Sequence, residues 1–338
     1  SNDKNRTKAF IEKLLQHKIN VYKNGDKFIV PMKQPQRRMV QTMFETYDTY
    51  KDSVFYDASA WSMVNFFNMP YRGVKSIPDG EQIKSIENLF NNELVEKSDY
   101  AYLIDWNDYY SPAALYFLQE KGIKLAAAFR TFETKTDTGP KKFDYGTLLI
   151  PVSKQSKSSQ EVYDIVKKAQ QKFNVPISAV NSGYSIKGID LGSNNFRALK
   201  KPKPALLIGE GVSSYEAGEV WHLLDTRFPM PLPKLRMTSF SANLLDKYNT
   251  LIMVSGSYTQ LDSVKRVQLK QWIAKGNTLI TIAGASKWVI DQKLVSEKLV
   301  KPKSTNQSKS RLPYVNAGPN AGKQRIGGAI LRGDIDLT

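Results

Sequence analysis

The chain has 338 residues, with no cysteine and two histidines, His17 and His222. Without cysteine it cannot form a disulfide framework, a thiol nucleophile, a zinc–thiolate centre or an iron–sulfur cluster, and two histidines cannot supply a site of three His ligands. Hydrophobic residues make up 41% and charged residues 24%, a globular composition. At roughly 100–200 residues per domain, the length predicts two domains.

Basic side chains outnumber acidic ones by 49 to 32, which gives a formal net charge of +17. The excess is spread along the chain, with +7 in residues 1–200 and +10 in residues 201–338. The densest basic stretch, residues 298–311, lacks the interleaved aromatic residues that stack on nucleic-acid bases. We therefore expect no nucleic-acid partner. The longest apolar runs are also far shorter than the ~20 residues of a membrane span, so no membrane-spanning segment is expected.

The first 60 residues predict short helices and strands in alternation. Apolar residues recur at helical spacing over residues 8–17 and 37–45, and residues 28–30 form a short apolar run ended by Pro31. Residues 53–58 are a further candidate strand.

From residue 101 onward, short apolar runs alternate with amphipathic segments. The runs predict strands at residues 102–104, 123–128, 147–152 and 176–180, and the segments predict helices at residues 112–120 and 158–173. Continuous apolar strands separated by helices are typical of a parallel sheet covered on both faces.

A linker is predicted at residues 200–204, where two prolines and three lysines occur in five positions. A second alternating unit follows, with strands at 205–208, 250–254 and 278–282 and helices that begin at Ser214 and Ser263. The sequence thus predicts an α/β protein with domains at 1–200 and 201–338. Each is expected to be a three-layer α/β/α unit with a mainly parallel sheet, and residues 329–331 are a candidate terminal strand.

Small and polar residues follow each predicted strand of the second unit. Since ligands of open parallel sheets bind outside the carboxyl ends of the strands, these residues predict a ligand crevice for a small molecule, a peptide or a sugar. Its candidate residues are Glu210, Ser213, Glu216, Ser255, Gly256, Ala283, Gly284 and Ser286. The turn at residues 209–211 is a weak candidate for phosphate binding, because it lacks a third glycine and Glu210 would repel a pyrophosphate.

Metal-binding and acid–base motifs are sparse. Glu219 and His222 are one helical turn apart, but two ligands do not hold a catalytic zinc, so no metal site and no cofactor are expected in this chain. Several carboxylates are candidates for acid–base pairs, although the sequence does not show which of them face each other. They are Asp105, Asp108, Glu133, Glu210 and Glu216.

Several segments are distinctive, above all GEGVSSYEAGEVW at residues 209–221, within 205–225, and also residues 28–36, 56–61, 188–193 and 327–330. Together they resemble the region that follows the catalytic domain in secreted zinc carboxypeptidase-like proteins of Bacteroidetes-type bacteria. Residues 202–338 are similar to the class I glutamine amidotransferase-like fold, which has a flavodoxin-like sheet.

This resemblance implies a metallopeptidase parent whose N-terminal peptidase domain is the partner of this region, in a secreted, periplasmic or cell-envelope protein. That family binds zinc through His-x-x-Glu and a later His. Here the third residue after His17 is Asn20 and that after His222 is Asp225, so zinc is implied only for the peptidase domain outside this chain. The resemblance also implies that the parent continues past Thr338 and that the second unit is truncated.

The amidotransferase resemblance implies a cysteine nucleophile on a sharp strand-to-helix turn, paired with a later histidine. The matching turn is residues 281–286, where Ala283 falls at or next to the nucleophile position and no histidine follows. Glu216 matches an acid that some members place beside the cysteine. We therefore expect no catalytic residue and a non-catalytic accessory role. The ligand-binding crevice is the alternative, and a cryptic hydrolase is the second alternative, which would need a base within about 3 Å of Ser286 or a facing carboxylate pair.

Overall fold

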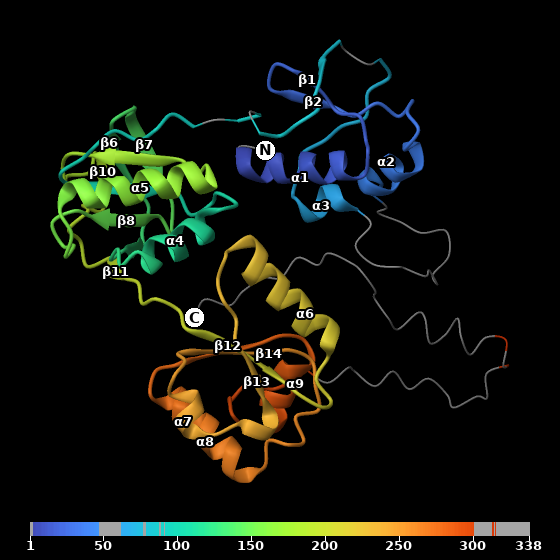
Figure 1. The fold of residues 1–338 in the computed structure, drawn as a ribbon, viewed down its shortest axis with the longest axis vertical. Helices are drawn as coiled ribbons and strands as arrows, with labels where there is room; N and C mark the ends of the chain where they lie inside the picture. Colours follow the sequence, from blue (N-terminus) through green and yellow to red (C-terminus); the bar gives the residue numbers. More distant parts are fainter. Residues whose placement is uncertain are drawn as a thin grey trace. The chain divides into compact units, whose positions relative to one another are not determined.

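The computed structural model describes residues 3–46, 62–76, 79–87, 89–90, 92–300, 313 and 315 (Figure 1). The chain divides into two compact units, Ser1–Asn92 with Ser304–Thr338, and Glu93–Lys303, and each is described by itself. The strands expected at residues 53–58 and 329–331 lie outside the described residues.

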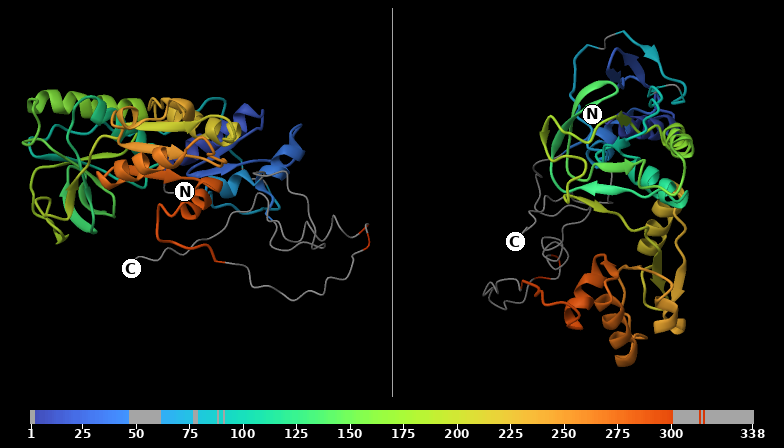
Figure 2. Two further views of the ribbon diagram at one scale, coloured as in Figure 1. Left: turned by 90° about the horizontal axis from the view of Figure 1, so that it is seen from below. Right: turned by 90° about the vertical axis from the view of Figure 1, so that its left-hand side faces the viewer.

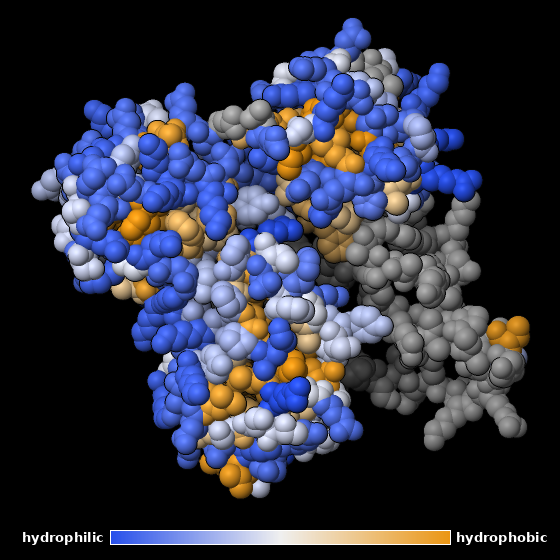
Figure 3. Space-filling view, in the orientation of Figure 1, coloured by the Kyte–Doolittle hydropathy of each residue, from blue (hydrophilic) through white to orange (hydrophobic). Residues whose placement is uncertain are grey.

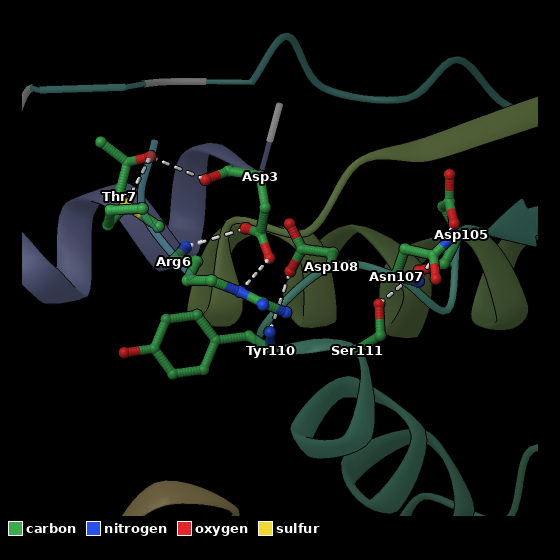
Figure 4. A network of polar contacts seen from close by, with 9 residues as sticks. Asp3, Arg6, Thr7, Asp105, Asn107, Asp108, Tyr110 and Ser111 are labelled. Carbon is green, nitrogen blue, oxygen red and sulfur yellow. Dashed lines mark hydrogen bonds and ion pairs between the residues drawn. The ribbon is translucent and has the colours of Figure 1, made fainter. Parts of the chain in front are cut away.

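The first unit packs short helices against a three-stranded antiparallel sheet, ordered β2-β1-β3. Helix α1 begins after Asp3, whose carboxylate accepts hydrogen bonds from the Arg6 backbone N–H at 2.8 Å and from its Nε at 3.2 Å (Figure 4). Helices α1 and α2 confirm the two predicted from the sequence. The elements are α1 Lys4–Gln16, β1 Tyr22–Asn24, β2 Lys27–Ile29, α2 Arg37–Phe44, α3 Met63–Phe66 and β3 Glu81–Gln82.

The second unit begins with a five-stranded sheet, ordered β11-β5-β8-β4-β9, in which every neighbouring pair is antiparallel. Its strand and helix order, β4-α4-β5-β8-α5-β9, is that of a split β-α-β fold. A hairpin, β6 and β7, is inserted between β5 and β8 and pairs with β10. The bounds are β4 Ala101–Ile104, α4 Ser111–Glu120, β5 Ala126–Ala128, β6 Phe132–Thr136, β7 Gly139–Phe143, β8 Leu148–Pro151, α5 Ser159–Phe173, β9 Ile177–Val180, β10 Lys187–Gly188 and β11 Phe196–Ala198.

The parallel sheet expected within residues 1–200 is therefore wrong for this region. Strands β4, β8 and β9 are buried on both faces, as the sequence indicated, but the second covering layer is a small sheet. Tyr102 and Ile104 belong to the core beneath α4 and α5, whereas Leu103 clusters with Phe132 and Phe143 of the hairpin. A continuous apolar run reports burial on two faces and does not report strand direction.

The rest of the second unit contains a parallel four-stranded sheet, ordered β13-β12-β14-β15, which confirms the parallel α/β arrangement expected here. Strand β12 begins at Pro204, inside the predicted linker. The elements are β12 Pro204–Ile208, α6 Ser214–His222, a π-helical turn Leu223–Arg227, β13 Lys234–Arg236, a 3-10 turn Met237–Ser239, α7 Ala242–Leu245, β14 Thr250–Met253, α8 Ser263–Ala274, β15 Thr278–Thr281 and α9 Gly284–Asp291.

Helices cover both faces of this parallel sheet. Leu206 and Ile252 cluster with Ala217 of α6 on one face, and Leu251 clusters with Trp272 of α8 on the other. Helix α6 accordingly lies on one face of the sheet, and α7 and α8 lie on the other face (Figure 1). Figure 2 shows the same elements from two further directions. Because β12, β14 and β15 run parallel, their carboxyl ends lie at one edge of the sheet.

Hydrophilic residues cover most of the visible face of the described parts, with apolar patches between them (Figure 3). Among the described residues, no helix is both long and apolar enough to span a bilayer.

Candidate functional site

The turn between β15 and α9 has a strained backbone. Ala283 lies at φ +49° and ψ −118°, a left-handed conformation that a residue with a Cβ rarely adopts, and it is the residue immediately before α9. Such strain costs about 1–3 kcal/mol and persists only where the surrounding structure fixes it. A sharp strand-to-helix turn of this kind exposes the nucleophile in enzymes that use a nucleophile elbow. Here the residue on the turn is an exposed alanine.

Hydrogen bonds join the ends of the three strands around this turn. The Ser255 backbone N–H donates to Glu216 Oε2 at 2.8 Å, and the Gly284 backbone N–H donates to Ser255 Oγ at 3.0 Å. The Ser213 backbone N–H donates to the Ser255 carbonyl oxygen at 2.8 Å. Four of the predicted crevice residues are thus in one hydrogen-bonded group, with Ala283 adjacent in the chain.

The glycine-rich turn after β12 is fixed by close backbone packing. Val212 and Gly256 form an isolated antiparallel bridge, and the Ser257 backbone N–H donates to the Gly211 carbonyl oxygen at 3.0 Å. Gly211 has φ +80°, and a Cβ there would lie 2.2 Å from Ser257 Oγ. The glycine is therefore required by this contact and this φ, while Glu210 beside it is exposed.

Ser286 lies on α9, one turn after Ala283, and is hydrogen-bonded to β15. Its hydroxyl lies 3.0 Å from Thr281 Oγ1 and donates to the Thr281 carbonyl oxygen at 3.2 Å. Neither group is a base that could remove a proton near neutral pH. The arrangement gives Ser286 a structural role at the start of α9.

Tyr258 is a member of this site that sequence reasoning missed. Its side chain is buried, and its hydroxyl donates to the Val254 carbonyl oxygen. Burial and, to a smaller extent, the nearby Glu216 charge raise the pKa of Tyr258 well above its usual value. An aromatic residue five positions after the end of a buried strand was the available signal, but it is equally typical of an ordinary core.

The other candidate carboxylates lie in the antiparallel half of the second unit. After β4, the Asn107 backbone N–H donates to Asp105 Oδ1 at 3.1 Å and the Tyr110 backbone N–H donates to Asp108 Oδ1 at 2.9 Å (Figure 4). Both carboxylates thus shape the turn that leads into α4. Glu133 lies on β6, opposite Lys142 of β7. These side chains come from different elements than Glu210 and Glu216.

No group of three or more His, Asp or Glu side chains with metal-site geometry occurs among the residues that the structure describes. Glu219 and His222 are both exposed on α6, and His17 is exposed at the end of α1. The residues present therefore do not fit a zinc ion of the carboxypeptidase kind.

Comparisons with known proteins give no relative: no protein-family model, no curated protein and no solved structure matches the chain.

Proposed function

We propose that the parallel half of the second unit is a non-catalytic relative of class I glutamine amidotransferases. The strand order supports this, because β13-β12-β14-β15 is the order 2-1-3-4 in chain sequence, as in the first four strands of a flavodoxin-like sheet. The observation that carries the proposal is the strained backbone of Ala283. The fold retains the conformation of a nucleophile elbow at a residue whose methyl side chain cannot attack a substrate.

The hydrogen-bond donors around Ala283 support the loss of activity. In an elbow enzyme, backbone N–H groups near the nucleophile stabilise the oxyanion of the tetrahedral intermediate. Here the Gly284 N–H is bonded to Ser255 Oγ and the Ser255 N–H is bonded to Glu216. A substrate oxyanion would have to displace protein groups from both donors. A ligand in the predicted crevice would have to do the same.

We further propose that the chain is an accessory region of a secreted zinc carboxypeptidase-like protein, in which it packs with the peptidase domain or presents substrate to it. The support is the sequence resemblance together with the absence of zinc ligands, thiol and activated serine from the described residues. Zinc chemistry would reside in the peptidase domain, outside these residues.

The first test is turnover by the purified chain. We expect no release of ammonia from glutamine and no release of C-terminal amino acids from peptides above the buffer rate. Turnover at about 1 s⁻¹ or faster, the range of ordinary enzymes, would overturn the non-catalytic assignment.

The accessory role is tested in the parent protein. Deleting this region should raise KM for peptide substrates by roughly an order of magnitude while kcat changes little, the signature of lost binding that is equal in ground and transition states. Equal KM values with and without the region would contradict substrate presentation.

A reactivity test probes the elbow itself. Because the chain has no cysteine, Ala283→Cys introduces a single thiol at the start of α9, where the helix N-terminus lowers a thiol pKa below about 8.5. Iodoacetamide should alkylate it faster at pH 7 than the matched variant Lys287→Cys, which places a thiol on the exposed side of the same helix. Equal rates would show that the turn does not activate a nucleophile.

A further inference from the structure

A groove lies on the α6 face of the parallel sheet, and Ser213 is among the residues that line it. Its volume is about 390 Å³. The floor is made by β12, where Ile208 is partly exposed and Leu206 is fully buried, and Ser214, Gly218 and Trp221 of α6 form one wall. The floor residues are apolar and the wall residues lie at helical spacing on one side of α6.

The groove exists because α6 has small residues where it crosses this part of the sheet. A Cβ added at Gly218 would meet no atom within 4 Å, so this position faces open space. Ser214, one turn earlier, is also small, and Trp221, one turn later, is 43% exposed. The aromatic ring therefore borders a space that the protein itself leaves unfilled.

Two cations lie beside this apolar floor. In the parallel pairing of β12 and β13, Lys234 is opposite Leu206 and Arg236 is opposite Ile208, which places both basic residues on the α6 face. Lys234 Nζ lies 3.7 Å from the centroid of the Trp221 ring. Within the described residues, neither Lys234 nor Arg236 forms an ion pair with a carboxylate.

We propose that this groove binds the C-terminal residue of a peptide. The apolar side chain would pack against Ile208 and Trp221, and the free carboxylate would pair with Lys234 at the rim. An apolar floor next to an unpaired cation is complementary to a ligand that is apolar at one end and anionic at the other.

The open edge of the sheet favours a peptide over a small free acid. Strand β13 is the terminal strand of the described sheet, so its outer edge has no strand partner there. A peptide whose C-terminal residue occupies the groove over β12 can run outward across β13, so that its preceding residues reach this edge, where backbone pairing is open. This binding function is independent of the amidotransferase-like elbow and would stand if that assignment failed.

Tryptophan fluorescence tests the proposal, because Trp221 borders the groove. The probes are acetyl-Ala-Ala-Leu with a free C-terminal carboxylate, the same peptide as its C-terminal amide, and N-acetyl-leucine. We expect saturable binding of the free peptide, with at least about tenfold weaker binding of the other two. Equal affinity for the amide would overturn the role of the carboxylate. Equal affinity for N-acetyl-leucine would show that the ligand is a small acid and would overturn the peptide assignment.

Two pairs of variants locate the site. Gly218→Leu should fill the groove and abolish the fluorescence response, whereas the matched Gly218→Ala leaves most of the space and should retain it. Lys234→Gln should weaken binding by about tenfold, whereas Lys270→Gln, an exposed cation on α8, should not. Each variant is checked for folding by circular dichroism. Absence of any response in the wild-type chain, or an undiminished response in both Gly218→Leu and Lys234→Gln, would overturn the proposal.

Discussion

The five-stranded and the four-stranded sheet of the second unit both contain short apolar strands, but the strands of the first are antiparallel and those of the second are parallel. Strands β4 and β12 are both short, apolar and buried on two faces. Beside β4 the layers are helices on one face and a small antiparallel sheet on the other; beside β12 they are helices on both faces. The comparison shows that an apolar composition predicts that a strand is buried on two faces. It does not predict the direction of the strand or whether helices or a second sheet supply the second layer.

The largest effect is expected in the core of the parallel half. Trp272 is 2% exposed, and its Nε1 donates to the Leu245 carbonyl oxygen at 3.0 Å. Trp272→Ala should lower the free energy of unfolding by about 3–5 kcal/mol, because it creates a large cavity. Urea denaturation followed by circular dichroism measures this. The half-exposed Trp221→Ala should cost under about 1 kcal/mol, and equal losses would contradict the assigned core.

The packing of the β6–β7 hairpin against the five-stranded sheet can be tested at an aromatic pair of the hairpin. The rings of Phe132 and Phe143 are stacked with centroids 5.1 Å apart, and both side chains are buried against the five-stranded sheet. Phe143→Ala should lower the free energy of unfolding by about 3–4 kcal/mol. The exposed Phe129→Ala is the control. A small loss at Phe143 would indicate that the hairpin does not cover the sheet in solution.

The glycine turn after β12 should tolerate a methyl group poorly. Gly211→Ala combines a φ of +80° with a contact to Ser257 Oγ, and it should destabilise the protein by about 1–3 kcal/mol. Gly218→Ala, in the open side of α6, should instead stabilise by up to about 1 kcal/mol because alanine favours the helix. Thermal melts should show a lower Tm for Gly211→Ala and a higher Tm for Gly218→Ala than for the wild-type chain. Equal effects would contradict the geometry of this turn.

High pH should weaken the packing around buried tyrosines in both halves. Burial raises the pKa of Tyr102 and of Tyr258 above the ordinary value near 10. The folded state therefore binds these protons more tightly than the unfolded state, and the stability that they contribute is present below about pH 10 and falls as the pH rises further. In urea titrations from pH 8 to 11, Tyr258→Phe should show a shallower decline than the wild-type chain. An unchanged slope would contradict the burial of an ionisable phenol there.

Part of this structure could be predicted from residue pattern alone. The small residues after β12, β14 and β15 correctly indicated that these strand ends meet, and Ala283 was expected at or next to the sharp turn. Hydrogen bonds between Glu216, Ser255 and Gly284 join these strand ends in the structure. The meeting of these strand ends was predictable because parallel strands bring their carboxyl ends together whatever the side chains between them.

Other features depended on contacts that a linear pattern does not encode. Strand β8 is antiparallel to β4 and β5 because the chain passes from β5 to β8 through the β6–β7 hairpin and not through a crossover helix. The hairpin strands alternate too briefly to stand out in the sequence. The groove beside Gly218 depends on where α6 crosses the sheet, and its cation depends on the pairing of β12 with β13, which places Lys234 next to Leu206. Local periodicity contains no information about which strands become neighbours.

The assignment of a nucleophile-elbow conformation depends on backbone strain at Ala283. Replacing this alanine by glycine measures that strain. Glycine adopts φ +49° without a Cβ penalty, so Ala283→Gly should raise the free energy of unfolding by about 1 kcal/mol. Lys270→Gly, in the interior of α8, should lower it by about 0.5–1 kcal/mol. Opposite signs in urea denaturation are the result that we predict. A loss of stability in both variants would show that Ala283 is unstrained and would contradict the elbow.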